Sequence, residues 1–155
     1  MSDGDPRIDI SISDDHIATL RAFLVLDSGW EELVSQLAQR GSLGGFAELG
    51  RAAFVVAVRR RFFSWSVAEI VRFVSAVRVR LLQDDIEIDP STAESLIRSA
   101  LGDVSQVDLD PDKIGSAQLL LLGELIFERD LNDAELDDFL NLARRFAAGR
   151  IGDDL

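Results

Sequence analysis

Apolar residues recur at helical spacing along most of this 155-residue chain. The segment 13–27 begins with Ser13, and Asp14 and Asp15 follow it directly. A hydroxyl at the N-cap and carboxylates in the first turn favour a helix start. The hydroxyl accepts a hydrogen bond from an unpaired backbone N–H, and the carboxylates interact favourably with the positive end of the helix dipole. The inner stripe of this predicted helix consists of Ile17, Leu20, Phe23 and Leu24.

Capping signals predict where further helices begin. Serine or asparagine is followed three residues later by glutamate, the pattern of a capping box, at Ser28 with Glu31, Ser66 with Glu69 and Asn132 with Glu135. Aspartate precedes proline at Asp89 with Pro90 and at Asp110 with Pro111. Proline suits the first helical position because its missing N–H would be unpaired there. These signals predict helices that start near residues 30, 67, 90, 111 and 133.

Two of the predicted helices, at about 45–62 and 111–129, are apolar almost all round. A helix without a broad polar face is expected inside a protein. We therefore predict an all-α, single-domain bundle of six or seven helices, with these two largely buried at its centre. Residues 1–12 are expected to be an extended N-terminal segment, 13–148 the helical domain and 149–155 a short tail.

The net charge of −12 is distributed unevenly. Residues 1–50 carry −6, residues 51–80 carry +6 and residues 81–155 carry −12. An acidic chain opposes long-range attraction to nucleic acid and to anionic lipid, although its middle segment is basic. No stretch is long and apolar enough for a membrane span, and no apolar signal segment opens the chain. We expect a soluble cytoplasmic protein, and the near-exclusive use of arginine over lysine suggests a bacterial source.

Few residues suited to catalysis are present. The chain has no cysteine or tyrosine, one histidine, His16, and one lysine, Lys113. Most pairs of nucleophile and base therefore cannot be assembled. His16 stands in a first helical turn, where a solvated histidine is expected. The glycines between residues 41 and 50 match no phosphate-binding pattern and are expected to form a loop. We predict a protein without enzymatic activity or cofactor.

One acidic segment imitates part of a calcium-binding loop. Asp108, Asp110 and Asp112 alternate as the first ligands of such a loop do. The sixth and twelfth positions, however, hold Lys113 and Leu119 instead of glycine and glutamate. No metal site is predicted.

The basic middle segment contains three consecutive arginines, Arg59, Arg60 and Arg61, followed by aromatic residues. They stand in the last turn of the helix predicted at 45–62, where guanidinium groups can bond the free carbonyls. With the next helix they would form an arginine-rich hairpin over residues 51–80. Binding of nucleic acid by this hairpin is the principal alternative function, disfavoured by the acidic remainder of the chain.

We therefore predict a non-enzymatic adaptor, regulator or self-associating module that acts through protein–protein contacts. Its partner is expected to be another protein, with a second copy of the chain as one candidate, because a basic hairpin and an acidic second half can attract each other across a dimer. A further alternative is an acidic inhibitor or immunity-type protein that binds a basic partner. The residues predicted to contact a partner are Arg59, Arg60, Arg61, Arg72, Arg80, Asp137 and Asp138.

Overall fold

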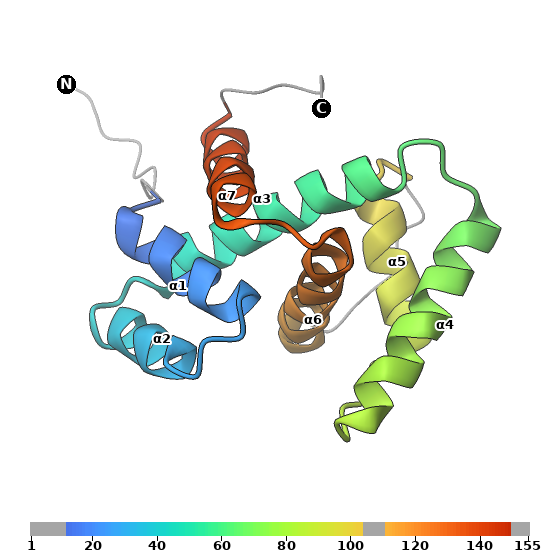
Figure 1. Cartoon of the computed structure of the whole chain (residues 1–155), viewed down its shortest axis with the longest axis horizontal. Coiled ribbons are helices and arrows are strands. Elements are labelled where there is room, and N and C mark those ends of the chain that lie inside the picture. Colours follow the sequence, from blue (N-terminus) through green and yellow to red (C-terminus); the bar gives the residue numbers. More distant parts are fainter. Residues whose placement is uncertain (1–11, 104–110, 150–155) are drawn as a thin grey trace.

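The computed structural model describes residues 12–103 and 111–149, which form helices joined by short turns, with no strand among these residues (Figure 1). The predicted all-α bundle is confirmed. The extended segment and tail predicted at the two ends, and the cap at Asp110, lie outside the described residues apart from residue 12 and residue 149. The helices are α1 Asp14–Leu24, α2 Trp30–Gln39, α3 Leu43–Arg61, α4 Val67–Gln83, α5 Pro90–Ala100, α6 Pro111–Arg129 and α7 Asp133–Ala147.

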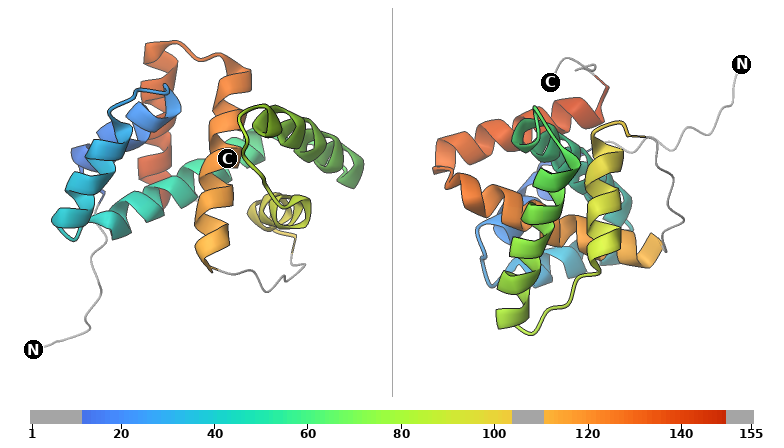
Figure 2. Two further views of the ribbon diagram at one scale, coloured as in Figure 1. Left: turned by 90° about the horizontal axis from the view of Figure 1, so that it is seen from below. Right: turned by 90° about the vertical axis from the view of Figure 1, so that its right-hand side faces the viewer.

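Helix α3 runs through the middle of the molecule and packs against α1, α2, α5, α6 and α7 (Figures 1 and 2). Its side chains Leu49, Phe54 and Val56 are almost completely buried. Helix α6 buries Leu121 and Leu122 against the same core. Both helices predicted to be central are therefore central, because neither has a polar face wide enough to stay in water.

Helix α4 lies at the edge of the molecule. It leaves α3 at a steep angle and packs side by side with α5, antiparallel to it (Figures 1 and 2). The predicted hairpin of α3 and α4 is therefore wrong, since the short connection between them, residues 62–66, turns α4 onto α5 instead. The buried residues of α4 are Ile70, Phe73, Val74, Val77 and Leu81. Val67, in the first turn, is half exposed.

Local capping accounts for most helix starts. Ser66 and Asp89 each accept a hydrogen bond from the backbone N–H three residues on, and Asn132 and Glu135 form a reciprocal capping box. The box predicted at Ser28 is wrong. Gly29 is the N-cap of α2, because the carboxylate of Asp27 accepts the Gly29 N–H at 2.9 Å and sets the turn one residue later.

His16 was expected in solvent, and this is also wrong: only 3 % of the residue is exposed. Its Nδ1 accepts the backbone N–H of Ser13 at 2.9 Å, so Nε2 carries the proton and donates to the Ser42 carbonyl oxygen at 2.8 Å. The ring thus joins the start of α1 to the start of α3. Gly45 leaves the space that the ring occupies.

Candidate functional site

Arg59 links two helices inside the fold. Its Nε donates to the carbonyl oxygen of Ala100, in the last turn of α5, at 3.1 Å, and its guanidinium lies 5.7 Å from the centre of the Phe146 ring. We predicted that it bonds the carbonyls of its own helix. Instead it donates a hydrogen bond to a carbonyl in the last turn of a neighbouring helix. Carbonyls in a last turn have no N–H partner within their own helix, so an arginine from another helix can bond them as well.

Arg61 and Arg80 both pair with acidic residues of α6. Arg61 Nε lies 2.5 Å from an oxygen of Glu128, and Arg80 Nε lies 3.0 Å from an oxygen of Glu124. Burial raises the pKa of Glu124, with Asp84 and Glu128 adding to the rise and Arg80 opposing it. The Arg80 guanidinium also stacks 4.4 Å from the centre of the half-exposed Phe127 ring. These two arginines therefore hold α3 and α4 to α6.

The acidic face of α7 is also partly engaged within the chain. Asp137 accepts a hydrogen bond from Nε of Arg21, on α1, at 3.0 Å, and Asp133 lies 3.4 Å from the same guanidinium. The hydrogen bond to Asp137 is the main cause that raises the pKa of Arg21. Asp137 is thus a link between α7 and α1.

Arg60, Arg72 and Asp138 form no ion pair or hydrogen bond with the part of the chain that the structure describes. Arg60 and Asp138 line one groove beside α7, of about 320 Å³. Arg72 lies apart from them, in a second depression beside Arg61 and Glu128. Of the seven residues predicted to contact a partner, these three have charges that stay available to one.

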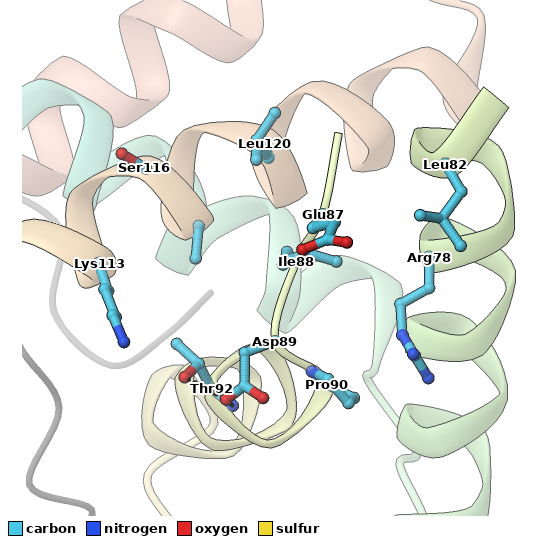
Figure 3. Close-up of a pocket in the computed structure, with 11 residues that line it drawn as sticks. Arg78, Leu82, Glu87, Ile88, Asp89, Pro90, Thr92, Lys113, Ser116 and Leu120 are labelled. Carbon is cyan, nitrogen blue, oxygen red and sulfur yellow. Dashed lines mark hydrogen bonds between the residues drawn. The ribbon is translucent and has the colours of Figure 1, made fainter. Parts of the chain in front are cut away.

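A cavity of about 860 Å³ lies between α4, the start of α5 and the first half of α6. Asp89 stands in it as the cap of α5, accepting from Thr92 N at 3.0 Å and from Thr92 Oγ1 at 2.7 Å. These bonds, followed by Lys113 and Arg78, lower the pKa of Asp89. Figure 3 shows the side chains of Lys113, from α6, and Arg78, from α4, on either side of Asp89. The apolar part of the lining consists of Leu82, Ile88, Pro90, Ala117 and Leu120.

Neither Arg78 nor Lys113 has an ion pair or hydrogen bond among residues 12–103 and 111–149. Two cations, Arg78 and Lys113, and two carboxylates, Glu87 and Asp89, thus border the apolar lining, and no ion pair joins these cations to these carboxylates. An apolar lining bordered by a few polar groups is the usual composition of a binding cleft. We call this cavity the α4–α6 cleft.

An exposed apolar row on α4 leads into the cleft. Val67 is 50 %, Val71 40 % and Leu82 52 % exposed, and with Ser75 and Arg78 they recur at helical spacing on one side of α4. Arg78 and Leu82 also line the cleft, so the row and the cleft are continuous. Phe63, just before α4, is 84 % exposed. We refer to Val67, Val71, Ser75, Arg78 and Leu82 as the α4 row.

Sequence reasoning missed this surface. Helix α4 carries more apolar residues than one buried stripe requires, and Val71, Val79 and Leu82 fall outside that stripe. This surplus was the available signal, since a helix packed on one side needs only one apolar face. No pattern in the sequence predicts that Lys113 lines the cleft, because its position depends on how α6 packs against the other helices.

No family model, no curated protein and no solved structure matches the chain. Within the described residues no three or more histidine or acidic side chains gather in a way that could hold a metal ion. In the same part of the chain, every helix is too short or too polar to cross a membrane. Asp108 and Asp110 of the calcium-like segment lie outside the described residues.

Proposed function

We propose that the protein acts without catalysis, as a regulator or adaptor that binds a helical segment of another protein on the α4 row and in the α4–α6 cleft. The observation that carries this proposal is the exposed row Val67, Val71 and Leu82, which continues into a cleft of about 860 Å³. Contiguous exposed apolar side chains mark an interaction surface; Val67 and Val71 adjoin one turn apart, and Leu82 adjoins the apolar wall of the cleft. A partner helix buries such a row with anchors at the same spacing.

The charges along this surface favour an acidic partner helix. Arg78 and Lys113 line the cleft and form no ion pair or hydrogen bond with the described residues, and Arg78 belongs to the α4 row itself. Carboxylates at the border of an apolar partner face would pair with these cations and set the orientation of the bound helix. The partner that fits is an amphipathic helix with leucine-like anchors and flanking aspartate or glutamate.

A second copy of this chain fits the same row less well. If two α4 rows paired with each other, each copy would bring Arg78 and no carboxylate to the contact. Like charges placed opposite each other in a contact oppose association. We therefore favour a different protein as the partner over the homodimer that the basic middle and acidic flanks of the sequence suggested. We propose that this interaction takes place in the cytoplasm.

The nucleic-acid alternative depended on the arginine-rich segment 51–80. Arg61 and Arg80 of this segment pair with Glu128 and Glu124, which removes two of the charges that phosphates would need. The inhibitor alternative depended on the acidic face of α7, where Asp137 pairs with Arg21. Both alternatives therefore have fewer charged side chains available for binding a partner than the sequence suggested.

A synthetic amphipathic helix, with leucines on one face and glutamates along its borders, tests the proposal by fluorescence anisotropy. We expect it to bind the protein more tightly than a peptide of the same composition in scrambled order. Val71→Asp should abolish this preference because it places a carboxylate beside Val67, in the apolar first half of the α4 row. Val25→Asp is the matched control, since Val25 is 48 % exposed but lies at the end of α1.

Equal binding of the ordered and scrambled peptides, or an equal loss in the two variants, would contradict the proposal. Light scattering of the wild-type protein at low and high salt tests the second copy as occupant. A dimer that Val71→Asp converts to a monomer would show that the row binds its own copy and would overturn the choice of a foreign partner.

A further inference from the structure

A second site is indicated by the groove beside α7, which is separate from the α4 row. The groove has a volume of about 320 Å³ and is bordered by the ends of α3 and α6 and by one side of α7. Its apolar wall includes the buried ring of Phe139. Each neighbouring element contributes one arginine: Arg60 from α3, Arg129 from α6 and Arg145 from α7.

Arg60, Arg129 and Arg145 share with Arg72 and Arg78 the lack of a bonded carboxylate among the described residues. Within the residues that the structure describes, none of the three forms an ion pair or a hydrogen bond, whereas Arg21 and Arg144 pair with carboxylates at about 3 Å. Burial lowers the pKa of Arg60, and the neighbouring charge of Arg129 lowers it further. The groove therefore holds like charges together at a cost that a bound anion would remove.

The helix dipole explains part of this arrangement. All three arginines stand in the last turns of their helices, where a cation is favourable. The dipole does not explain why three such ends border one groove. It also does not explain why Arg60 and Arg129 approach each other, since each could satisfy its own helix end while pointing into solvent.

Two acidic residues also border the groove, and they narrow the choice of ligand. Glu135 is engaged in its capping box, accepting the Asn132 N–H at 3.0 Å. Asp138 has no ion pair or hydrogen bond among the described residues, so its oxygens can accept hydrogen bonds from a ligand. The lining is thus rich in donors on the arginine side and offers a free acceptor at Asp138.

We propose that this groove binds a small ligand through an oxyanion, a phosphate or carboxylate group held by Arg60, Arg129 and Arg145, with Asp138 accepting a hydrogen bond from a neighbouring hydroxyl or ammonium group. Planar guanidinium groups bind such oxyanions through paired N–H donors. The site does not depend on the proposed contact of α4, because the two surfaces share no residue.

Titration with inorganic phosphate and, separately, with acetate tests this site, at constant ionic strength maintained with chloride. We expect saturable shifts of the Nε–Hε NMR signals of Arg60 and Arg129, together with a rise in Tm. Arg60→Gln and Arg129→Gln should each weaken binding about tenfold or more, the loss expected for one charge-assisted hydrogen bond. Arg72→Gln, which removes an exposed arginine of α4 outside this groove, should leave binding unchanged.

A further variant separates an anion site from a merely structural cluster. Asp138→Asn removes a negative charge from the border of the groove and should tighten phosphate binding, because less repulsion opposes the anion. Comparison of phosphate with acetate identifies the oxyanion that the site prefers. The proposal is overturned if the shifts do not saturate, if chloride produces them equally, or if Arg72→Gln weakens binding as much as Arg60→Gln does.

Discussion

Substitution of Gly45 by alanine tests the packing between α1 and α3 most directly. A Cβ atom at Gly45 would lie 2.7 Å from Nε2 and 2.9 Å from Nδ1 of His16, closer than non-bonded atoms approach. The imidazole cannot simply turn away, because it is buried and both ring nitrogens are hydrogen-bonded to Ser13 and Ser42. The variant must therefore displace the ring or shift α3 away from α1.

The expected magnitude follows from three contributions. Alanine is favoured over glycine inside a helix by about 1 kcal/mol. Overpacking costs about 1–3 kcal/mol. Loss of the two His16 hydrogen bonds to the backbone of Ser13 and Ser42 costs about 1 kcal/mol each. Gly45→Ala should therefore lower the free energy of unfolding by about 2–4 kcal/mol, since the losses exceed the gain in helix propensity.

The adjacent glycine provides a matched control. Gly44 belongs to the same turn of α3, and a Cβ added there meets no other atom within 4 Å. Gly44→Ala should therefore raise the free energy of unfolding by about 0.5–1 kcal/mol, the gain in helix propensity alone. The two neighbouring substitutions are thus expected to have opposite signs.

Urea denaturation followed by circular dichroism measures both variants, and a double-mutant cycle locates the cause. In a His16→Ala background the ring is absent, so Gly45→Ala should cost little or become stabilising. The reasoning would be refuted if Gly45→Ala destabilised the protein equally in both backgrounds, or if it behaved as Gly44→Ala does.

Three further predictions concern helix ends. Leu26 follows α1 with φ of 59° and is 78 % exposed, so Leu26→Gly should raise the free energy of unfolding by about 0.5–1 kcal/mol in urea denaturation; a loss would show that the left-handed backbone is not strained. Asn132→Ala removes the side-chain bond to the Glu135 N–H at 2.8 Å and should cost about 1 kcal/mol by the same assay. Hydrogen bonds from Thr92 lower the pKa of Asp89, so its contribution to stability is present above the pKa of an unfolded aspartate, about 3.9, and is lost as the pH falls through the lower folded value. Asp89→Asn should therefore flatten the decline of Tm below pH of about 4, and an unchanged acid profile would contradict this assignment.

The helix starts were largely predictable because their causes are local. Asp89 with Pro90, and Asn132 with Glu135, place donor and acceptor within four residues of each other, so the backbone needs no help from distant parts of the chain. The failure at Ser28 shows the limit of this reasoning. Asp27 also offers an oxygen to the same turn, and its hydrogen bond to the Gly29 N–H moved the helix start by one residue.

The site residues were predictable as charges but not as partners. Arg59, Arg60 and Arg61 are neighbours in the sequence, yet they point to different surroundings because successive residues on a helix are about 100° apart. Arg61 therefore meets Glu128, 67 residues away, whereas Arg60 enters the groove beside α7. Their different roles follow from which helix lies against each side of α3.

By itself, the sequence determined the helical class, most caps and the two central helices, since periodicity and capping act over a few residues. Tertiary structure alone decided that α4 packs on α5 and that His16 is enclosed by α3. It also decided that two separate cavities are bordered by cations with no ion pair among the described residues. These features depend on how helices cross, which follows from the fit of whole side-chain surfaces. Patterns within a few residues of sequence therefore cannot predict how the helices cross.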